Sequence, residues 1–292
     1  MAATGAVVVS MRLGISSISS FRKSPFCRLP RISLRFIKTS KKIEQQGLAI
    51  RCSFNDLQYQ IREEGQVDGL DYRVFLLDHT GKKMSPWHDV PLHSGDGVFN
   101  FVVEIPKGSN LRMEVATDEQ YTPIEQDKRR KRIRCDMMWN YGLLPQTWED
   151  PSSANPEVEG AFGDNDPVDV VEIGTSSAKI GEILKVKPLA TLALIDEGEL
   201  DWKIIAISLN DPRASLVHDV DDIDKHFPDT LTAISHFFRD YKTYYDGIPG
   251  NKFGLGDKPA NKDYALKVIK ETNDSWSKLV RRSIPAGVLS LE

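Results

Sequence analysis

The chain has 292 residues, of which 40% are hydrophobic and 27% are charged, and its formal net charge is −4. This composition is typical of a globular protein, and the length suffices for one large domain or two small ones. The sequence contains no apolar run near the roughly 20 residues that a membrane-spanning helix needs, so we expect no membrane partner.

The N-terminal segment differs in charge from the rest of the chain. Residues 1–43 contain nine Lys or Arg and eight Ser but no Asp or Glu. An Arg-rich, Ser-rich and acid-free stretch is typical of an organelle transit peptide, and the apolar run Ala6–Val9 is too short for a secretory signal. Because Ala49–Ser53 resembles a plastid processing site, we predict a disordered chloroplast transit peptide over residues 1–52. Mitochondrial import is the nearest alternative, and a basic arm that binds nucleic acid is another.

Removal of this segment would leave an acidic protein. Residues 1–52 carry ten basic residues and one acid, Glu44, so residues 53–292 hold a net charge of −13. Such a charge argues against nucleic acid as a partner and suits a protein that collects divalent cations. Of the three cysteines, only Cys135 would remain, so we expect no disulfide framework.

Strand signals follow in quick succession after the polar stretch 55–69. Runs of β-branched and aromatic residues bounded by Gly, Pro or Asn predict strands. These runs are Leu70–Leu77, Val98–Ile105, Asn110–Ala116, Val168–Ile173, Ile180–Val186, Thr191–Ile195 and Trp202–Leu209. A basic loop, Lys128–Arg134, interrupts the series. Short strands at close spacing favour a closed barrel over alternating βαβ units.

The last third of the chain has helical periodicity. Apolar residues recur at helical spacing at Leu231, Ile234, Phe237, Phe238 and Tyr241, and Pro228 suits a first helical turn. A second helix is expected after Asn261, whose side chain can cap it. Its apolar face would consist of Tyr264, Ala265, Val268, Ile269 and Trp276. No linker divides residues 53–292, so we predict one α+β domain in which helices pack outside a barrel.

Two acidic turns carry the most specific chemistry. Asp164, Asp166 and Asp169 lie within six positions, and a proline fixes the backbone between them. The second turn, Asp196–Asp201, joins two strand-like runs, and Lys203 follows so closely that a strand would place Asp201 and Lys203 on one face. Carboxylates without nearby His or Cys select hard ions, which favours Mg²⁺.

The acidic turns also have simpler explanations. Aspartates are common in solvated turns, so either turn alone is compatible with a surface role. An EF-hand is excluded by spacing, because Val168 and Thr175 occupy the fifth and twelfth positions counted from Asp164. If the turns converge, two carboxylates about 6 Å apart repel by roughly 3 kcal/mol, and bound cations would relieve this repulsion.

Several motifs together resemble a known family. The residues Val103–Pro106, Tyr141–Asp150, Asp164–Asp169 and Asp196–Lys203 resemble those of family I soluble inorganic pyrophosphatases, and the plant chloroplast members most. The resemblance spans residues 70–292. It implies a five-stranded, OB-like closed β-barrel with flanking α-helices, several Mg²⁺ ions, and hydrolysis of magnesium pyrophosphate to two phosphates. It also favours a monomer over a dimer.

The resemblance further implies a role for each site residue. Asp166 would be the general base for a water activated by the metals. The metal ligands would be Asp164, Asp169, Asp201, Asp196, Glu114 and Glu104, with Asp169 bridging the two activating ions. The phosphate groups would be bound by Arg112, Arg134, Tyr141, Lys203, Tyr241 and Lys242.

Three departures from the family pattern lie on the substrate side. Arg112 stands where the family has lysine, which replaces a compact ammonium by a planar fork. The segment Asp127–Asn140 is shorter than in the family, which leaves Arg132 as an alternative to Arg134, and Thr243–Pro249 replaces a loop that carries another lysine. A catalytically impaired paralogue that serves as a metal-binding or regulatory protein is therefore the alternative. A further hypothesis is an OB-like module that binds oligonucleotides, but the acidic charge of residues 53–292 argues against it.

Overall fold

The computed structural model describes residues 50–53, 58–128, 131–133, 135–246 and 250–292, which belong to the compact unit Gln46–Glu292. Residues 1–49, most of the expected transit peptide, lie outside the described residues. The end of that segment belongs to strand β1 (Ile50–Ser53), which pairs with β2. Within the described ranges, no helix combines the length and the apolar character needed to cross a membrane.

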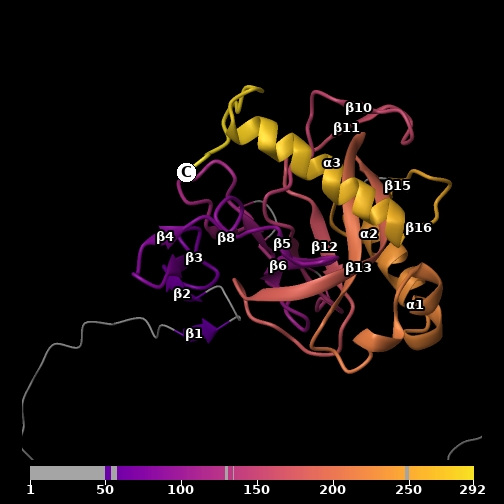
Figure 1. Ribbon diagram of the computed structural model, residues 1–292, viewed down its shortest axis with the longest axis horizontal. Coiled ribbons are helices and arrows are strands. Elements are labelled where there is room, and N and C mark those ends of the chain that lie inside the picture. Colours follow the sequence, from indigo (N-terminus) through magenta and orange to yellow (C-terminus); the bar gives the residue numbers. More distant parts are fainter. Residues whose placement is uncertain (1–49, 54–57, 129–130, 134, 247–249) are drawn as a thin grey trace, which may run out of the picture. The chain divides into compact units, whose positions relative to one another are not determined.

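The larger of the two sheets in the described residues holds the strands that position the site. Its central strands are β6 (Val98–Ile105), β9 (Asn140–Leu143), β12 (Asp169–Glu172), β13 (Ile183–Asp196) and β14 (Glu199–Ser208), among which β6, β12 and β13 are labelled in Figure 1. β12 pairs with β14 and β9, β9 pairs with β6, β6 pairs with β13, and β13 pairs with β14. Shorter strands extend this sheet: β5 (His93–Gly95), β10 (Ala154–Asn155), β11 (Ala161–Gly163), β15 (Lys252–Phe253) and β16 (Ala260–Asn261).

Both faces of the central strands are buried, which explains their incomplete alternation in sequence. In β14, Ile205 and Ile207 belong to one apolar cluster, whereas Trp202 and Ile204 belong to a second cluster on the other face. Strands covered on both sides read as near-continuous apolar runs. The runs Ile180–Val186 and Thr191–Ile195 were predicted as separate strands but are joined in β13. A bulge lies between them, directly after Pro188, a residue that cannot donate to the ladder.

The smaller sheet has the order β1-β2-β3-β8-β7, with β4 (Lys83–Met84) paired to β3. Its other strands are β2 (Gln58–Glu64), β3 (Arg73–Asp78), β7 (Met113–Val115) and β8 (Ile124–Gln126). The sequence did not predict β2, because Tyr59 and Ile61 are its only buried side chains in a polar stretch. The predicted strand Leu70–Leu77 begins three residues later than expected.

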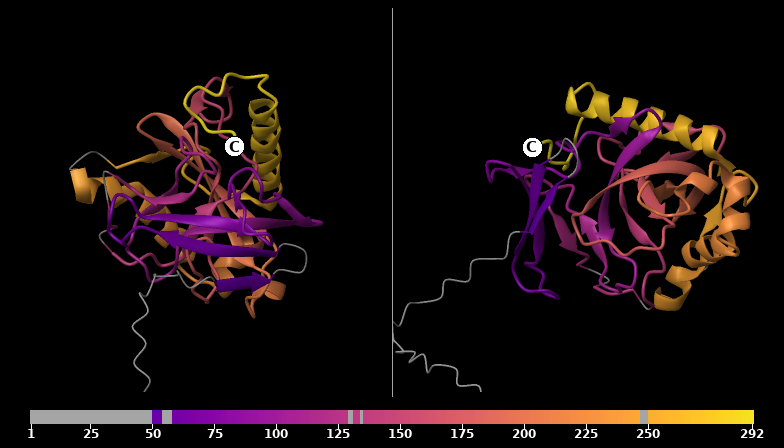
Figure 2. Two further views of the ribbon diagram at one scale, coloured as in Figure 1. Left: turned by 90° about the vertical axis from the view of Figure 1, so that its left-hand side faces the viewer. Right: turned by 60° about the horizontal axis from the view of Figure 1, so that its bottom comes forward.

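In the described part of the chain, three α-helices cover the larger sheet: α1 (Val220–His226), α2 (Thr230–Asp246) and α3 (Lys262–Val280). α3 lies along the strands of that sheet (Figure 2), and its Asn261 cap accepts a hydrogen bond from Tyr264 N, as predicted. Pro228 was expected in the first turn of α2, and this was wrong. It lies in a turn, because the positive φ of Asp229 (62°) separates it from the helix. The short helix α1 was not predicted.

Candidate active site

A cavity of about 590 Å³ collects the residues that the sequence singled out. Its wall comes from the end of β6, from β7, from the start of β12, from the β13–β14 hairpin and from α2. Within the described part of the chain, the lining holds twelve carboxyl side chains and four Lys or Arg. The two acidic turns meet in this cavity, which excludes their interpretation as unrelated solvated turns.

Eleven predicted site residues line the cavity: Asp166, Asp164, Asp169, Asp201, Asp196, Glu114, Glu104, Arg112, Tyr141, Lys203 and Tyr241. Arg134 lies outside the described residues, and so does the side chain of Lys242 in α2. Arg132, the alternative to Arg134, lines the cavity and pairs with Asp68 at 2.6 Å.

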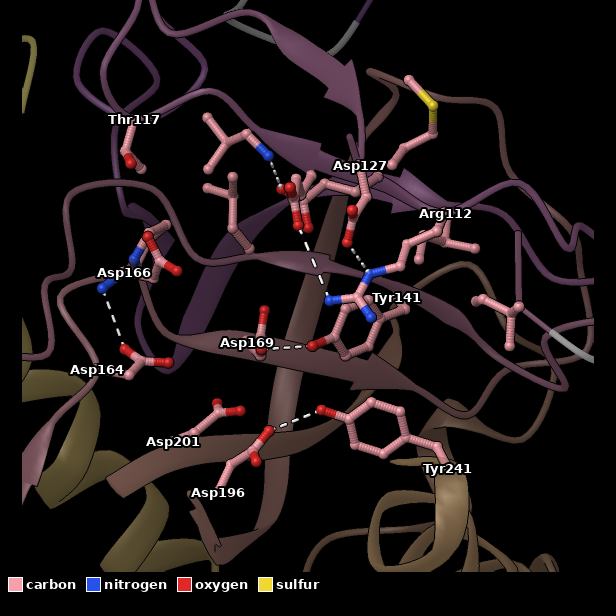
Figure 3. A pocket seen from close by; sticks show the side chains of 18 of the residues that line it. Arg112, Thr117, Asp127, Tyr141, Asp164, Asp166, Asp169, Asp196, Asp201 and Tyr241 are labelled. Atoms are coloured by element: carbon pink, nitrogen blue, oxygen red, sulfur yellow. Dashed lines mark hydrogen bonds and ion pairs between the residues drawn. The ribbon is translucent and has the colours of Figure 1, made fainter. Parts of the chain in front are cut away.

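The first acidic turn is held in a compact shape by its own hydrogen bonds (Figure 3). Asp166 N donates to Asp164 Oδ1 at 3.0 Å, and Asn165 between them has a φ of 75°. Gly163 begins the turn against the backbone of Glu149, where an added Cβ would lie 2.4 Å from Glu149 C. Only glycine fits so close an approach, and Asn is among the few other residues that tolerate a positive φ.

The second acidic turn is the tight hairpin between β13 and β14. Asp196 pairs with Glu199 across the hairpin, and Glu197 (53°) and Gly198 (97°) both have a positive φ. Two central residues with positive φ match the right-handed twist of the flanking strands. The hairpin brings Asp196 and Asp201 to the cavity, where Tyr241 of α2 donates to Asp196 at 2.7 Å (Figure 3).

Lys203 is the buried cation at the centre of the site. The parallel pairing of β12 and β14 places Asp169 directly beside Lys203, and the strand period places Asp201 on the same face. Lys203 Nζ forms ion pairs with both carboxylates, and Tyr141 OH donates to Asp169. Burial alone would lower the pKa of Lys203, but Asp169 and Asp201 outweigh it, and the pKa lies well above the ordinary value.

The remaining carboxylates repel one another. Burial and then Asp166 raise the pKa of Asp164 to about 8, and burial and then Asp169 raise the pKa of Asp166 to about 7. Burial is also the first cause of the raised pKa of Glu104. A raised carboxyl pKa means that the ionised form is disfavoured unless a positive charge is added.

One group of carboxylates has the geometry of a cation site. Oxygens of Glu149, Asp164 and Asp201 lie within 4.8 Å of one another. Glu149 is buried; its Oε1 accepts from Trp202 N at 2.8 Å, and its Oε2 has no hydrogen-bond partner among the described residues. Among those residues no His or Cys lines the cavity, so its donor atoms fit a hard divalent cation. Sequence reasoning missed Glu149, because its burial leaves no signal in the pattern.

The opposite wall of the cavity combines acids with Arg112. Its Nε donates to Asp127 at 2.8 Å, and its Nη2 lies 3.9 Å from Glu114 (Figure 3). Burial and then Asp127 raise the pKa of Glu114 to about 7. Glu104 accepts from Val115 N at 2.7 Å. Asp127 was not among the predicted site residues, although it directly precedes the basic loop.

Comparisons with known proteins agree on one family. A family model described as inorganic pyrophosphatase matches residues 101–277. The chain is 69% identical over 237 residues to the soluble inorganic pyrophosphatase 6, chloroplastic, of Arabidopsis thaliana, covering 80% of this chain and 79% of that protein. It is 47% identical over 264 residues to the soluble inorganic pyrophosphatase 1, chloroplastic, of Chlamydomonas reinhardtii, covering 85% of this chain and 93% of that protein.

Solved structures give the same result. The inorganic pyrophosphatase of Schistosoma japonicum matches with a TM-score of 0.75 and 38% identity, covering 79% of this chain and 84% of that one. A truncated vacuolar soluble pyrophosphatase of Trypanosoma cruzi in complex with pyrophosphate matches with a TM-score of 0.73 and 37% identity. That match covers 85% of this chain and all of the other.

Proposed function

We propose that this chain hydrolyses pyrophosphate to two phosphates in its acidic cavity. The chain belongs to the family of inorganic pyrophosphatases. The observation that carries the proposal is the convergence of two sequence-distant acidic turns and a buried lysine in one cavity. The family membership argues against the alternative of a binding protein without catalytic activity.

The all-oxygen donor set of the cavity supports Mg²⁺ as the cation. Asp164, Asp169 and Asp201 would hold the activating ions, Asp196 and Glu114 those that accompany the substrate, and Glu104 would act through water. Bound magnesium supplies a Lewis acid that lowers the pKa of the attacking water and neutralises charge on the phosphates. The clustering of these carboxylates around one cavity supports the assignment.

Asp166 is assigned as the general base that accepts the proton of the attacking water. Its side chain is exposed to the cavity and lies in the same turn as Asp164 and Asp169, so it could accept a proton from a water held by the metal ions. Lys203, Tyr141, Tyr241 and Arg112 carry the N–H and O–H donors that would bind phosphate oxygens. Arg134 and Lys242 are assigned to the same task from the resemblance alone.

Release of phosphate from pyrophosphate by the full-length chain tests this function. We expect turnover with MgCl₂ and none with excess EDTA. Asp166→Asn should lower kcat by about 10²- to 10⁴-fold, the usual contribution of a general base. Asp224→Asn, on the exposed side of α1, is the matched control and should keep full turnover. Absence of turnover in the folded wild-type protein would favour the binding-protein alternative, and turnover unchanged by Asp166→Asn would refute the assigned base.

Three finer assignments accompany the function. The ring of pairings through β6, β9, β12, β13 and β14 supports a closed, five-stranded OB-like barrel. The chloroplastic relatives support a chloroplast location with residues 1–52 as the transit peptide, which N-terminal sequencing of the imported protein would test. The protein is proposed to act as a monomer, which sedimentation of the imported protein would test.

A further inference from the structure

The turn Gly163–Asp166 rests on the segment Trp148–Glu149. Asn165 N donates to Glu149 O at 3.0 Å, and Glu149 N donates to Asp166 O at 3.0 Å. The glycine at the start of the turn touches the Glu149 backbone so closely that no side chain would fit. The acidic turn is therefore bound to this segment along its whole length.

Asn165 faces the opposite way from its two acidic neighbours. Asp164 and Asp166 line the cavity (Figure 3), whereas Asn165 does not. Its Oδ1 accepts a hydrogen bond from Trp148 Nε1 at 3.2 Å. The positive φ of Asn165 turns the chain between the two carboxylates, and the amide connects this turn to the protein interior.

Trp148 is itself rigidly anchored. It is 2% exposed and belongs to an apolar cluster with Trp87, Leu279 and Leu289. Its backbone N donates to Thr272 O of α3 at 3.0 Å. An indole N–H can only donate, so a buried tryptophan needs an acceptor, and Asn165 supplies it.

We propose that the Trp148–Asn165 hydrogen bond is a positioning clamp that holds Asp164 and Asp166 in the arrangement needed for cation binding and turnover. Neither side chain would touch the substrate, and both would act through the two aspartates. The clamp connects the cavity to α3, because Trp148 is fastened to Thr272. This inference rests on the proposed function, and it extends that function to residues outside the cavity.

The competing explanation is that Asn165 is present only because it tolerates a positive φ. Asn165→Gly separates the two, because glycine keeps the backbone conformation and removes the amide. Trp148→Phe removes the donor and keeps an aromatic ring. A neutral hydrogen bond contributes enough to change an equilibrium about twofold to tenfold, so each variant should weaken Mg²⁺ binding by about that factor.

The experiment uses the full-length chain and two measurements. Calorimetric titration with Mg²⁺ without substrate gives cation affinity, and steady-state phosphate release gives kcat and KM. We expect each single variant to weaken cation binding and to lower kcat about threefold to tenfold with KM nearly unchanged. The two variants should have similar effects because they remove the same hydrogen bond. The double variant should then be no worse than the more affected single variant.

Trp276→Phe is the matched control. Trp276 packs against the same apolar cluster and donates its indole N–H to His88 Nδ1 at 2.9 Å, away from the acidic turn. It should lower thermal stability without changing Mg²⁺ affinity or kcat. Full Mg²⁺ affinity in Asn165→Gly, or additive losses in the double variant, would overturn the clamp. Asn165→Gly alone decides the question if Trp148→Phe does not fold. The calorimetric result stands even if Asp166→Asn shows that the base is misassigned.

Discussion

Replacement of Glu149 by Gln should stabilise the metal-free protein. Glu149 oxygens lie within 4.8 Å of those of Asp164 and Asp201, and at that distance two ionised carboxylates repel by about 3.5 kcal/mol at an effective dielectric near 20. If Glu149 instead takes up a proton to avoid this repulsion, the free energy of protonation at neutral pH destabilises the folded protein by a similar amount. The ordinary pKa of Glu149 is 4.5, and protonation at pH 7 then costs about 3.4 kcal/mol at 1.36 kcal/mol per pH unit.

The amide avoids both costs and keeps an oxygen for Trp202 N. Because the nearby Lys203 already offsets part of the repulsion, we expect a gain of about 2–3 kcal/mol in the free energy of unfolding. The folded-state pKa of Glu149 is raised, first by burial and then by Asp164, so the wild-type protein loses stability as the pH rises above 4.5. The advantage of the amide should therefore be largest near neutral pH and vanish below pH 4.5.

Guanidinium unfolding of the full-length chain in EDTA, at pH 7.5 and at pH 4.5, measures this difference. Added Mg²⁺ should then stabilise the wild-type protein more than Glu149→Gln, because binding to the folded state adds stability in proportion to affinity. Glu172→Gln is the matched control, a buried acid outside the active-site cavity whose Oε2 accepts from Asn140 Nδ2 at 2.8 Å. The oxygen of the new amide would keep the hydrogen bonds from Gly174 N and Ser208 N, but its NH₂ group would face the donor Asn140 Nδ2, which should cost about 1–3 kcal/mol. A destabilised Glu149→Gln at pH 7.5 would refute the electrostatic reasoning.

Three further predictions concern substrate binding, pH and the hairpin. Arg112→Ala should raise KM for pyrophosphate about tenfold or more with a smaller change in kcat, since a hydrogen bond to a charged group contributes about 1.5–3 kcal/mol. Steady-state assays measure both constants, and an unchanged KM would exclude Arg112 from substrate binding. Burial is the first cause of the lowered pKa of His88, so its contribution to stability should fall as the pH drops below about 6.5. Thermal melts of His88→Gln should therefore approach those of the wild-type protein at pH 5, and a constant difference would contradict this. Gly198→Ala should cost about 1–2 kcal/mol in urea unfolding because of the φ of 97°, and unchanged stability would show that the hairpin relaxes.

The residues that the sequence could identify are those with a local chemical pattern. The Asp164–Asp169 turn is recognisable because three acids and a proline crowd six positions, and Asn261 because it precedes a periodic apolar run. Strand period alone placed Lys203 and Asp201 on one face, and the ion pair between them confirms it.

The residues that the sequence could not identify depend on tertiary burial. Glu149 resembles any acid of a polar segment until the packing of Trp148 and the ladder of β14 enclose it. Strand β2 carries only two buried side chains, so its alternation is visible only once β3 lies beside it. The seven residues of α1 end before a clear period develops, and its start depends on an Asp219 side chain that accepts from Val220 N.

The acidic cavity needs a rigid backbone around it, because its carboxylates must stay close together to bind cations. Carboxylates that repel one another spread apart unless the backbone prevents it, and a spread site would bind cations weakly. The positive φ of Asn165, the tight hairpin at Gly198 and the two ion pairs of Lys203 each oppose that movement. This backbone therefore stores unfavourable electrostatic energy in the metal-free protein, and cation binding releases it. Substitutions that loosen this backbone should therefore reduce the stability that the protein gains when it binds magnesium. The same substitutions should also lower its activity.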